Sequence, residues 1–464
     1  MIEVGIFDTG AMDLAHRKTA NGTRIVDGSL ADIHEAARRL TRNQIRRAVL
    51  ADRLGFDYFW MSEHHFNTEG AELSSNPLQS QTAIAMLTKR LRLGQLANIT
   101  AFWHPLRLAE QIGILDVLSG GRVEVGVGRG YQAREAETFG QAYGSTVQDQ
   151  ERNRSYHEEA VEILIKAWTE ESFYHQGDFY SLPPSYTKWN HSQTIAYFQE
   201  LGIVDDVFKL GAPDMYSSGP SITNSTTTLK QLSVLPQPLQ RPHPPMWEPV
   251  TSERSIRYAA SHGFNGNHFN DTSKSLKLRI ETYMDEAEKC GWPDYLDRGE
   301  FKYGWDAEKH RGVSAGRVIH IVDKNIGNIQ KADDAMMFEW DFYKPFGFAA
   351  VLADPGETPD PNTEVTYDLL REKGIVIAGS VEEVTEGLLK LRDDCYAEGD
   401  FIVNVWFEAG GMAQQDIEDQ IQCFGEEVLP ALQRECGGGV DRPDVGIADD
   451  LVAGIGDLRP VTAA

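Results

Sequence analysis

The sequence HPLRLAEQIGILDVLSGGRVEVGVGRGYQ, residues 104–132, predicts a helix, a tight turn and a buried strand in direct succession. Apolar residues recur in its first half at the three- and four-residue spacing of one helix face: Leu106, Leu108, Ile112, Leu115 and Leu118. Gly120 and Gly121 should end this helix, because glycine adopts positive φ at no steric cost. The valines at 123, 125 and 127 then form a strand that ends at Gly128-Arg129-Gly130. In α/β enzymes, the carboxyl end of a parallel strand is where anions and cofactors bind, so Arg129 is a candidate phosphate ligand.

The same alternation of strand and helix runs along most of the chain. Apolar strands are expected at 2–8, 56–60, 91–97, 123–127, 245–247, 264–269, 317–322 and 401–407. Helices are expected at 35–54, 77–88, in the segment quoted above, and at 149–168, 252–262, 272–290 and 381–396. Eight such units predict a parallel sheet closed into a (β/α)8 TIM barrel rather than an open, doubly wound sheet.

Two stretches interrupt this alternation, and a third follows it. Residues 172–243, rich in proline, serine, threonine, tyrosine and asparagine, form a long insertion after the fourth βα unit. A connection of that length is typical of a lid, a binding loop or disorder. A second irregular stretch is expected near 340–375. We therefore expect one barrel domain over 1–436, with the insertion as a candidate lid, and a flexible C-terminal tail over 437–464 that hangs free.

Composition excludes several classes of protein. A hydrophobic content of 41% is enough for a substantial core, and a net charge of −26 argues against binding of nucleic acid. No apolar run approaches the roughly 20 residues that span a bilayer, so we expect no membrane segment. The four cysteines form neither a CxxC pair nor a zinc motif, a pattern that favours the reducing cytoplasm.

Glu63-His64-His65-Phe66 directly follows the second strand. In a barrel this position puts an imidazole at the catalytic face, where it could act as a general acid or base. A metal site or a surface loop with two incidental histidines would give the same pattern. A metal site needs further ligands at suitable spacing, and adjacent histidines point different ways, so we expect no metal.

Thr251-Ser252-Glu253-Arg254-Ser255 opens a predicted helix after a strand. Hydroxyls and unpaired amides at a helix N-terminus can bind an anion, although a simple N-cap uses the same residues. In a barrel the loops after successive strands converge, so one phosphate could contact both Arg129 and this segment. The glycines of GVGRG do not fit a dinucleotide fingerprint, because the third follows the second after two residues rather than three.

Together these motifs resemble the bacterial luciferase-like flavin-dependent monooxygenases. The resemblance rests on the quoted segment, on Leu91-Arg92-Leu93-Gly94, on Glu63-His64-His65-Phe66 and on 252–263, and it covers about 1–170 and 233–435. It implies a (β/α)8 barrel that binds reduced FMN from a separate NAD(P)H-dependent flavin reductase. It also implies that oxygen is activated as a flavin C4a-peroxide and inserted into a small apolar substrate.

The resemblance also assigns roles to individual residues. His64 corresponds to the active-site histidine near the flavin, and Arg129, with Gly130, to the phosphate-binding position. Thr251, Ser252 and Ser255 correspond to the other phosphate contacts, although the luciferases have glutamate at the Thr251 position. Gly128 stands where those enzymes have a reactive cysteine. The strand around Asn98 and Thr100 should face the isoalloxazine ring.

Two other functions stay open on the sequence. One is a deazaflavin-dependent oxidoreductase of the same superfamily that transfers hydride without oxygen, and the other is a flavin-binding protein without turnover. Glu-His-His-Phe together with Gly-Arg-Gly favours the monooxygenase. The resemblance further implies a cytoplasmic homodimer, and the substrate stays unidentified among aldehydes, alkanes, terpenes, ketones and organosulfur compounds.

Overall fold

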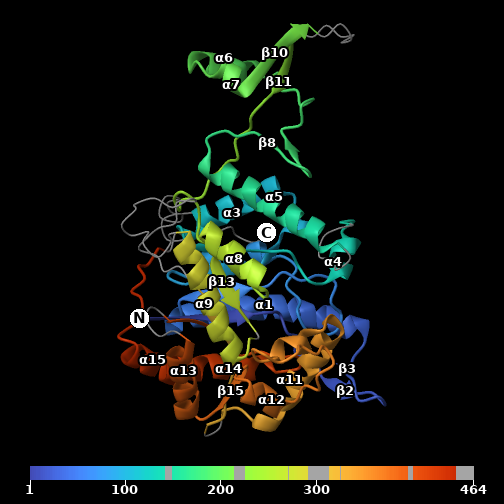
Figure 1. Ribbon diagram of the computed structural model, residues 1–464, viewed down its shortest axis with the longest axis vertical. Coiled ribbons are helices and arrows are strands. Elements are labelled where there is room, and N and C mark those ends of the chain that lie inside the picture. Colours follow the sequence, from blue (N-terminus) through green and yellow to red (C-terminus); the bar gives the residue numbers. More distant parts are fainter. Residues whose placement is uncertain are drawn as a thin grey trace, which may run out of the picture.

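Eight parallel strands close into a barrel that helices surround (Figure 1). The computed structural model describes residues 1–141, 149–213, 225–269, 271–290, 313–323, 326–395 and 401–445. The barrel strands are β1 (Ile2–Asp8), β4 (Tyr58–Met61), β5 (Arg92–Gln95), β7 (Val123–Gly128), β12 (Met246–Pro249), β13 (Asn265–His268), β14 (Val313–Ile321) and β16 (Phe401–Trp406). The ring closes because β12 pairs with β7 while β16 pairs with β1. The predicted strands and the (β/α)8 TIM barrel are confirmed.

The outer helices also lie where the sequence predicts them. They are α1 (Leu30–Leu54), α2 (Pro77–Leu87), α3 (Pro105–Ser119), α5 (Gln150–Thr169), α8 (Glu253–His262), α9 (Ser273–Lys289) and α13 (Val381–Cys395). Two further helices, α14 (Gln414–Cys423) and α15 (Leu429–Glu435), were not predicted. As predicted, α3 ends at Gly120, whose φ of +71° is in the left-handed region. Among the described residues, no helix is long and apolar enough to cross a membrane.

The inside of the barrel is filled by large aromatic side chains. The indoles of Trp60 and Trp247 pack edge to face with their centroids 4.9 Å apart, and both are almost completely buried. Gly94 lies against the Trp60 ring, and a Cβ added there would come within 1.9 Å of an indole carbon. This packing fills the described part of the barrel interior below the loops that follow the strands.

We expect Gly94→Ala to lower the free energy of unfolding by about 1–3 kcal/mol, because the added methyl group overpacks a core that cannot relax. Gly28→Ala is the matched control, since its Cβ would meet only the Asp32 side chain, at 3.4 Å. Urea denaturation of both variants measures the difference. Equal midpoints for the two variants would contradict the packing described for the barrel interior.

The irregular stretch expected near 340–375 is only partly irregular. It begins within the last turn of α11 (Ile329–Tyr343), a helix that sequence periodicity did not reveal, it contains α12 (Tyr367–Glu372), and β15 (Val376–Gly379) follows it. Almost all of the second half of α11 is buried, including Glu339 and Tyr343. A helix buried on all sides lacks the apolar stripe by which a surface helix is recognised. Because α11 follows β14, it lies at the mouth of the barrel.

The 172–243 insertion is anchored at its base and extended beyond it. The Glu159 carboxylate on α5 accepts hydrogen bonds from the backbone N–H groups of Asp178, Phe179 and Tyr180. The outer part consists of α6 (Ser192–Glu200), α7 (Val204–Val207), β10 (Phe208–Pro213) and β11 (Ser225–Leu229), and it stands away from the barrel on the side of α3 and α5 (Figure 1). Closure of this insertion over the active site stays a prediction, because its outer part is clear of the barrel in this arrangement.

Part of the tail that we expected to hang free is packed against the barrel. Gly439 forms a bridge with Ile2 at the start of β1. The Arg442 guanidinium forms ion pairs with the buried carboxylates of Glu3 and Asp57. Residues 437–445 therefore cover the amino-terminal ends of β1 and β4, whereas 446–464 lie outside the described residues.

Candidate active site

His64 lies just past the carboxyl end of β4 and is buried, with 7% of its surface exposed. The loop that carries it folds back on itself, since the His64 N–H donates to the Ser74 carbonyl at 3.1 Å. This fold brings Glu72 Oε2 to 3.4 Å from His64 Nε2. Glu72 has a φ of +49°, which a side chain other than glycine adopts only at a cost in free energy. The surrounding structure therefore holds Glu72 against the imidazole.

A second carboxylate flanks the other side of the ring. Glu135 Oε1, from the short helix α4 (Ala133–Thr138) after β7, lies 3.4 Å from His64 Nδ1. Burial on its own lowers the pKa of His64, but the charge of Glu72 and the hydrogen bond to Glu135 outweigh it and raise the pKa to about 9. His64 is therefore a cation at neutral pH and suits the role of a proton donor better than that of a base.

The two histidines of the motif diverge. His65 turns toward the rings of Phe102 and Phe139, with centroids at 5.2 and 4.8 Å. Glu63 accepts hydrogen bonds from the Ile99 backbone N–H at 2.6 Å and from Trp103 Nε1 at 2.7 Å. Among the described residues, no group of three or more histidine, cysteine, aspartate or glutamate side chains is arranged to hold a metal ion.

Aromatic side chains form a wall beside His64. The Tyr131 ring lies edge-on to the imidazole at 5.5 Å, and its hydroxyl donates a hydrogen bond to the Glu72 carboxylate. On its other side, Tyr131 packs against Phe346 and Phe348 at 5.1 and 5.0 Å. Because these residues follow β7 and β14, this wall lies at the mouth, where it can exclude water.

Three arginines gather where β7, α5 and α8 meet. Arg129 donates to Gln150 Oε1 at 3.0 Å, and Arg254 forms an ion pair with Glu151. Burial lowers the pKa of Arg129, and the charges of Arg154 and Arg254 lower it further, while the carboxylates of Glu248 and Glu158 act in the opposite direction without reversing the shift. Positive charges this close together repel one another, and a bound anion would reduce that repulsion. In a chain of net charge −26 this cluster is a suitable donor set for a phosphate group.

The serines at the start of α8 largely cap the helix. Ser252 Oγ accepts from the Ser255 N–H at 3.3 Å, while Ser255 Oγ accepts from the Ser252 N–H at 3.1 Å. Ser255 Oγ also donates its one proton to the Ser252 carbonyl at 2.9 Å, which leaves none for a phosphate. The side chains of Thr251 and Ser252 are exposed, so these two and the helix N-terminus can still contact an anion. Gly130, with φ +71°, makes the turn after Arg129.

Asn98 is fully buried in the barrel wall. Its amide nitrogen donates to Gln95 Oε1 at 3.0 Å and to the Gly126 carbonyl at 2.9 Å, which ties the ends of β5 and β7 together. Its Oδ1 has no hydrogen-bond partner among the described residues. Nearby, Thr100 Oγ1 donates to the Gly128 carbonyl at 3.3 Å.

Sequence reasoning missed most of the groups that contact His64. It did not single out Glu72, Glu135 or Tyr131, nor Tyr343 and Glu339 on α11. A glutamate followed four residues later by a tyrosine, inside the apolar run 335–343, was the one available signal of a buried polar pair. Arg154 and Arg254 were also missed as partners of Arg129.

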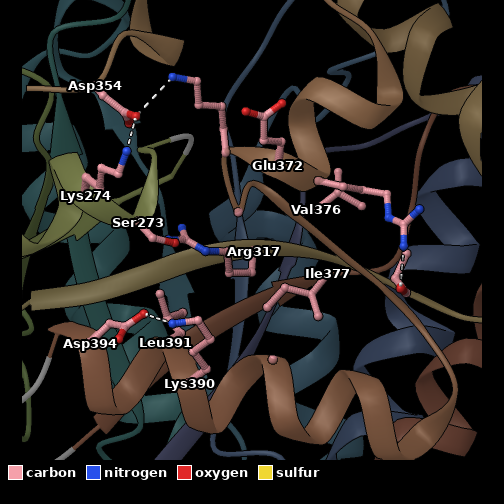
Figure 2. A pocket seen from close by; sticks show the side chains of 15 residues that line it. Ser273, Lys274, Arg317, Asp354, Glu372, Val376, Ile377, Lys390, Leu391 and Asp394 are labelled. Atoms are coloured by element: carbon pink, nitrogen blue, oxygen red, sulfur yellow. Dashed lines mark hydrogen bonds and ion pairs between the residues drawn. The ribbon is translucent and has the colours of Figure 1, made fainter.

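A cavity of about 550 Å³ lies outside the barrel wall between α9, β15 and α13 (Figure 2). None of the residues predicted from the sequence as site residues lines it. Lys274 and Lys373 form ion pairs with Asp354, and Lys390 forms one with Asp394. These lysine charges are thus already balanced by carboxylates, and we assign no ligand to this cavity.

Comparison with known proteins gives consistent results. The family model for luciferase-like monooxygenases matches residues 23–196. The oxygenase component of a flavin-dependent trigonelline monooxygenase from Acinetobacter baylyi is 24% identical over 403 residues, which are 86% of this chain and 91% of the relative. The chain is therefore similar to that protein over nearly its whole length.

Two solved structures illustrate the shared fold. The oxygenating constituent of 3,6-diketocamphane monooxygenase from Pseudomonas putida, a complex with FMN, aligns with a TM-score of 0.61 at 18% identity and covers 93% of this chain and 98% of its own. An F420-dependent secondary alcohol dehydrogenase aligns with a TM-score of 0.56 at 15% identity and covers 93% of this chain and 99% of its own. At these identities, both show only that the barrel is shared.

Proposed function

We propose that the chain is a flavin-dependent monooxygenase that uses reduced FMN and O2 to oxygenate a small apolar substrate, because the luciferase-like monooxygenase family model matches residues 23–196 and the oxygenase component of a flavin-dependent monooxygenase is 24% identical over 403 residues. The observation that carries this proposal is the gathering of Arg129, Arg154 and Arg254 at the carboxyl ends of the strands. Arg129 and His64 lie on loops that follow β7 and β4, and Arg154 and Arg254 lie near the N-termini of α5 and α8. A phosphate held at the arginines would orient a flavin there.

Each group has a distinct task in this proposal. Arg129 and Arg254, together with Thr251 and the N-terminus of α8, hold the phosphate, while Arg154 strengthens the positive potential behind them. Reduced FMN, when bound, supplies the two electrons with which one oxygen atom enters the substrate and the other leaves as water. His64 donates a proton into this site, and the aromatic wall of Tyr131, Phe346 and Phe348 excludes water.

A separate NAD(P)H-dependent reductase is the proposed source of reduced FMN. The trigonelline relative is named as the oxygenase component of its enzyme, a name that implies a second component. We further propose a homodimer in the cytoplasm, where the reductase and its nicotinamide cofactor are present.

Hydride transfer with a deazaflavin is the second candidate function. It is favoured by the fold shared with the F420-dependent dehydrogenase, and an arginine cluster would hold the phosphate of either cofactor.

Parallel titrations with FMN and F420, followed by flavin or deazaflavin fluorescence, distinguish the two cofactors. We expect FMN to bind at least tenfold more tightly, about 1.4 kcal/mol. Tight F420 binding with weak FMN binding would overturn the proposal. Tight FMN binding without substrate-dependent oxygen uptake, across the five compound classes named above, would indicate a flavin carrier.

A further inference from the structure

A chain of buried hydrogen-bonding groups leads away from His64. Behind the imidazole, Glu72 Oε1 accepts a hydrogen bond of 2.8 Å from the Tyr343 hydroxyl. The same hydroxyl lies 3.3 Å from Glu339 Oε1, and the other carboxyl oxygen of Glu339 accepts the Gly410 N–H at 3.1 Å. His64, Glu72, Tyr343 and Glu339 are all buried, so the contacts run through the protein interior.

We propose that Glu339 is a proton reserve for His64 and that Tyr343 and Glu72 pass its proton on. This proposal rests on the proposed function in one respect, namely that His64 gives up a proton in each turnover. The neutral Glu339 carboxyl group donates to the Tyr343 hydroxyl as that hydroxyl donates its own proton to Glu72 Oε1. The Glu72 carboxyl group, now protonated, turns so that this proton faces His64 and donates it to Nε2. The net change is one proton fewer on Glu339 and one more on His64, and Tyr343 and Glu72 return to their starting states.

The charges around the two ends of the chain fit this direction of transfer. Glu339 faces Glu408 and Glu72, and burial together with these two carboxylates raises its pKa to about 8. His64 faces Glu72 and Glu135 directly, Glu63 at longer range, and the neutral side chains of Tyr131 and Gln132. A neutral Glu339 therefore coexists with a cationic His64 at neutral pH. After His64 loses its proton, the neutral Glu339 carboxyl group can supply another through Tyr343 and Glu72.

The need for a reserve follows from burial. A site that excludes water also prevents bulk solvent from reprotonating His64 while the mouth is closed. One stored proton per turnover is sufficient, and Glu339 regains it when the mouth opens. Tyr343 is the relay residue, because its hydroxyl is the one group that contacts both carboxyl groups among the described residues.

The first test needs no cofactor. Histidine-labelled protein is titrated by NMR, with the His64 signal assigned from a His64→Gln sample. We expect Glu72→Gln to lower the pKa of His64 by about 1 to 3, because an opposite charge at this distance is removed. Tyr343→Phe, which changes no charge, should leave that pKa within about 0.5 of the wild type. A neutral His64 at pH 7 in the wild type, or no change in Glu72→Gln, would overturn the proposal.

Infrared spectroscopy tests the reserve itself. The wild type at pH 7 should show the carbonyl stretch of protonated buried carboxyl groups, and Glu339→Gln should lose the part of this band that Glu339 contributes, while Glu248, whose pKa burial raises to about 8, keeps its own. If the two spectra coincide in that region, Glu339 holds no proton and the proposal fails.

Turnover tests the relay. In Tyr343→Phe we expect a first turnover at the wild-type rate and a steady-state rate that is lower by roughly tenfold. Tyr367→Phe is the control, because its hydroxyl bonds His320 and lies outside this chain of contacts. An unchanged steady-state rate in Tyr343→Phe would refute the relay. If instead the wild type oxygenates nothing while the NMR and infrared results hold, the proposed function fails and the reserve stands.

Discussion

Replacing His64 by glutamine should lower the rate of substrate oxygenation by roughly 10²- to 10⁴-fold, the usual contribution of a positioned proton donor. Glutamine keeps a hydrogen-bond donor between Glu72 and Glu135 but cannot give up a proton at neutral pH. FMN binding should stay within about twofold, because the arginine cluster that holds the phosphate is separate from this residue. Product formation under saturating reduced FMN, and FMN binding by fluorescence, measure the two effects.

The adjacent histidine provides the control for this variant. His65→Gln removes a ring that faces Phe102 and Phe139 and contacts Glu63 rather than Glu72. We expect His65→Gln to keep at least a third of the wild-type rate, which corresponds to a rise of less than about 0.7 kcal/mol in the activation free energy. Equal losses in both variants would mean that His64 acts through the structure of the loop and not through proton transfer.

Arg129→Ala should weaken FMN binding about ten- to a hundred-fold, because a hydrogen bond to a charged group contributes about 1.5–3 kcal/mol. The remaining charges of Arg154 and Arg254 should prevent complete loss. The effect should shrink as salt concentration rises, since ions screen the charges at the half-exposed edge of the cluster. Fluorescence titration at two ionic strengths measures both.

Arg107→Ala is the matched control for the charge itself. Arg107 lies on the outer face of α3, where it pairs with Glu110 and is two-thirds exposed. Arg107→Ala removes the same unit of charge at a residue whose ion-pair partner is Glu110. Normal FMN affinity in Arg129→Ala, or an equal loss in Arg107→Ala, would show that the phosphate assignment is wrong.

The barrel could be predicted from the sequence because its signals are local. Each strand is a short apolar run, and α3 ends at a glycine that takes a positive φ, as the segment 104–132 predicts. The helix α11 could not be predicted in this way, because its second half is buried and shows no apolar stripe. The position of the insertion was also predicted, but its extension away from the barrel depends on contacts that no local pattern encodes.

Only those residues of the candidate site that belong to a recognisable sequence motif could be predicted. His64 and Arg129 follow strands directly, so connectivity alone puts them at the mouth. The groups that determine the charge of His64 come from two segments, since Glu72 follows β4 and Glu135 follows β7, and Tyr343 reaches Glu72 from α11. Ser255 shows the opposite case. The sequence suggests a phosphate ligand there, but the Ser255 hydroxyl donates its proton to the Ser252 carbonyl at the start of α8.

The fate of molecular oxygen tests the central claim most directly. Purified protein is mixed with reduced FMN and ¹⁸O₂ in the presence of the substrate that most stimulates oxygen uptake, and the product is analysed by mass spectrometry. If the protein is a monooxygenase, we expect one ¹⁸O atom in each product molecule and the other in water. A product without the label, formed by transfer of hydride from the cofactor, would contradict it.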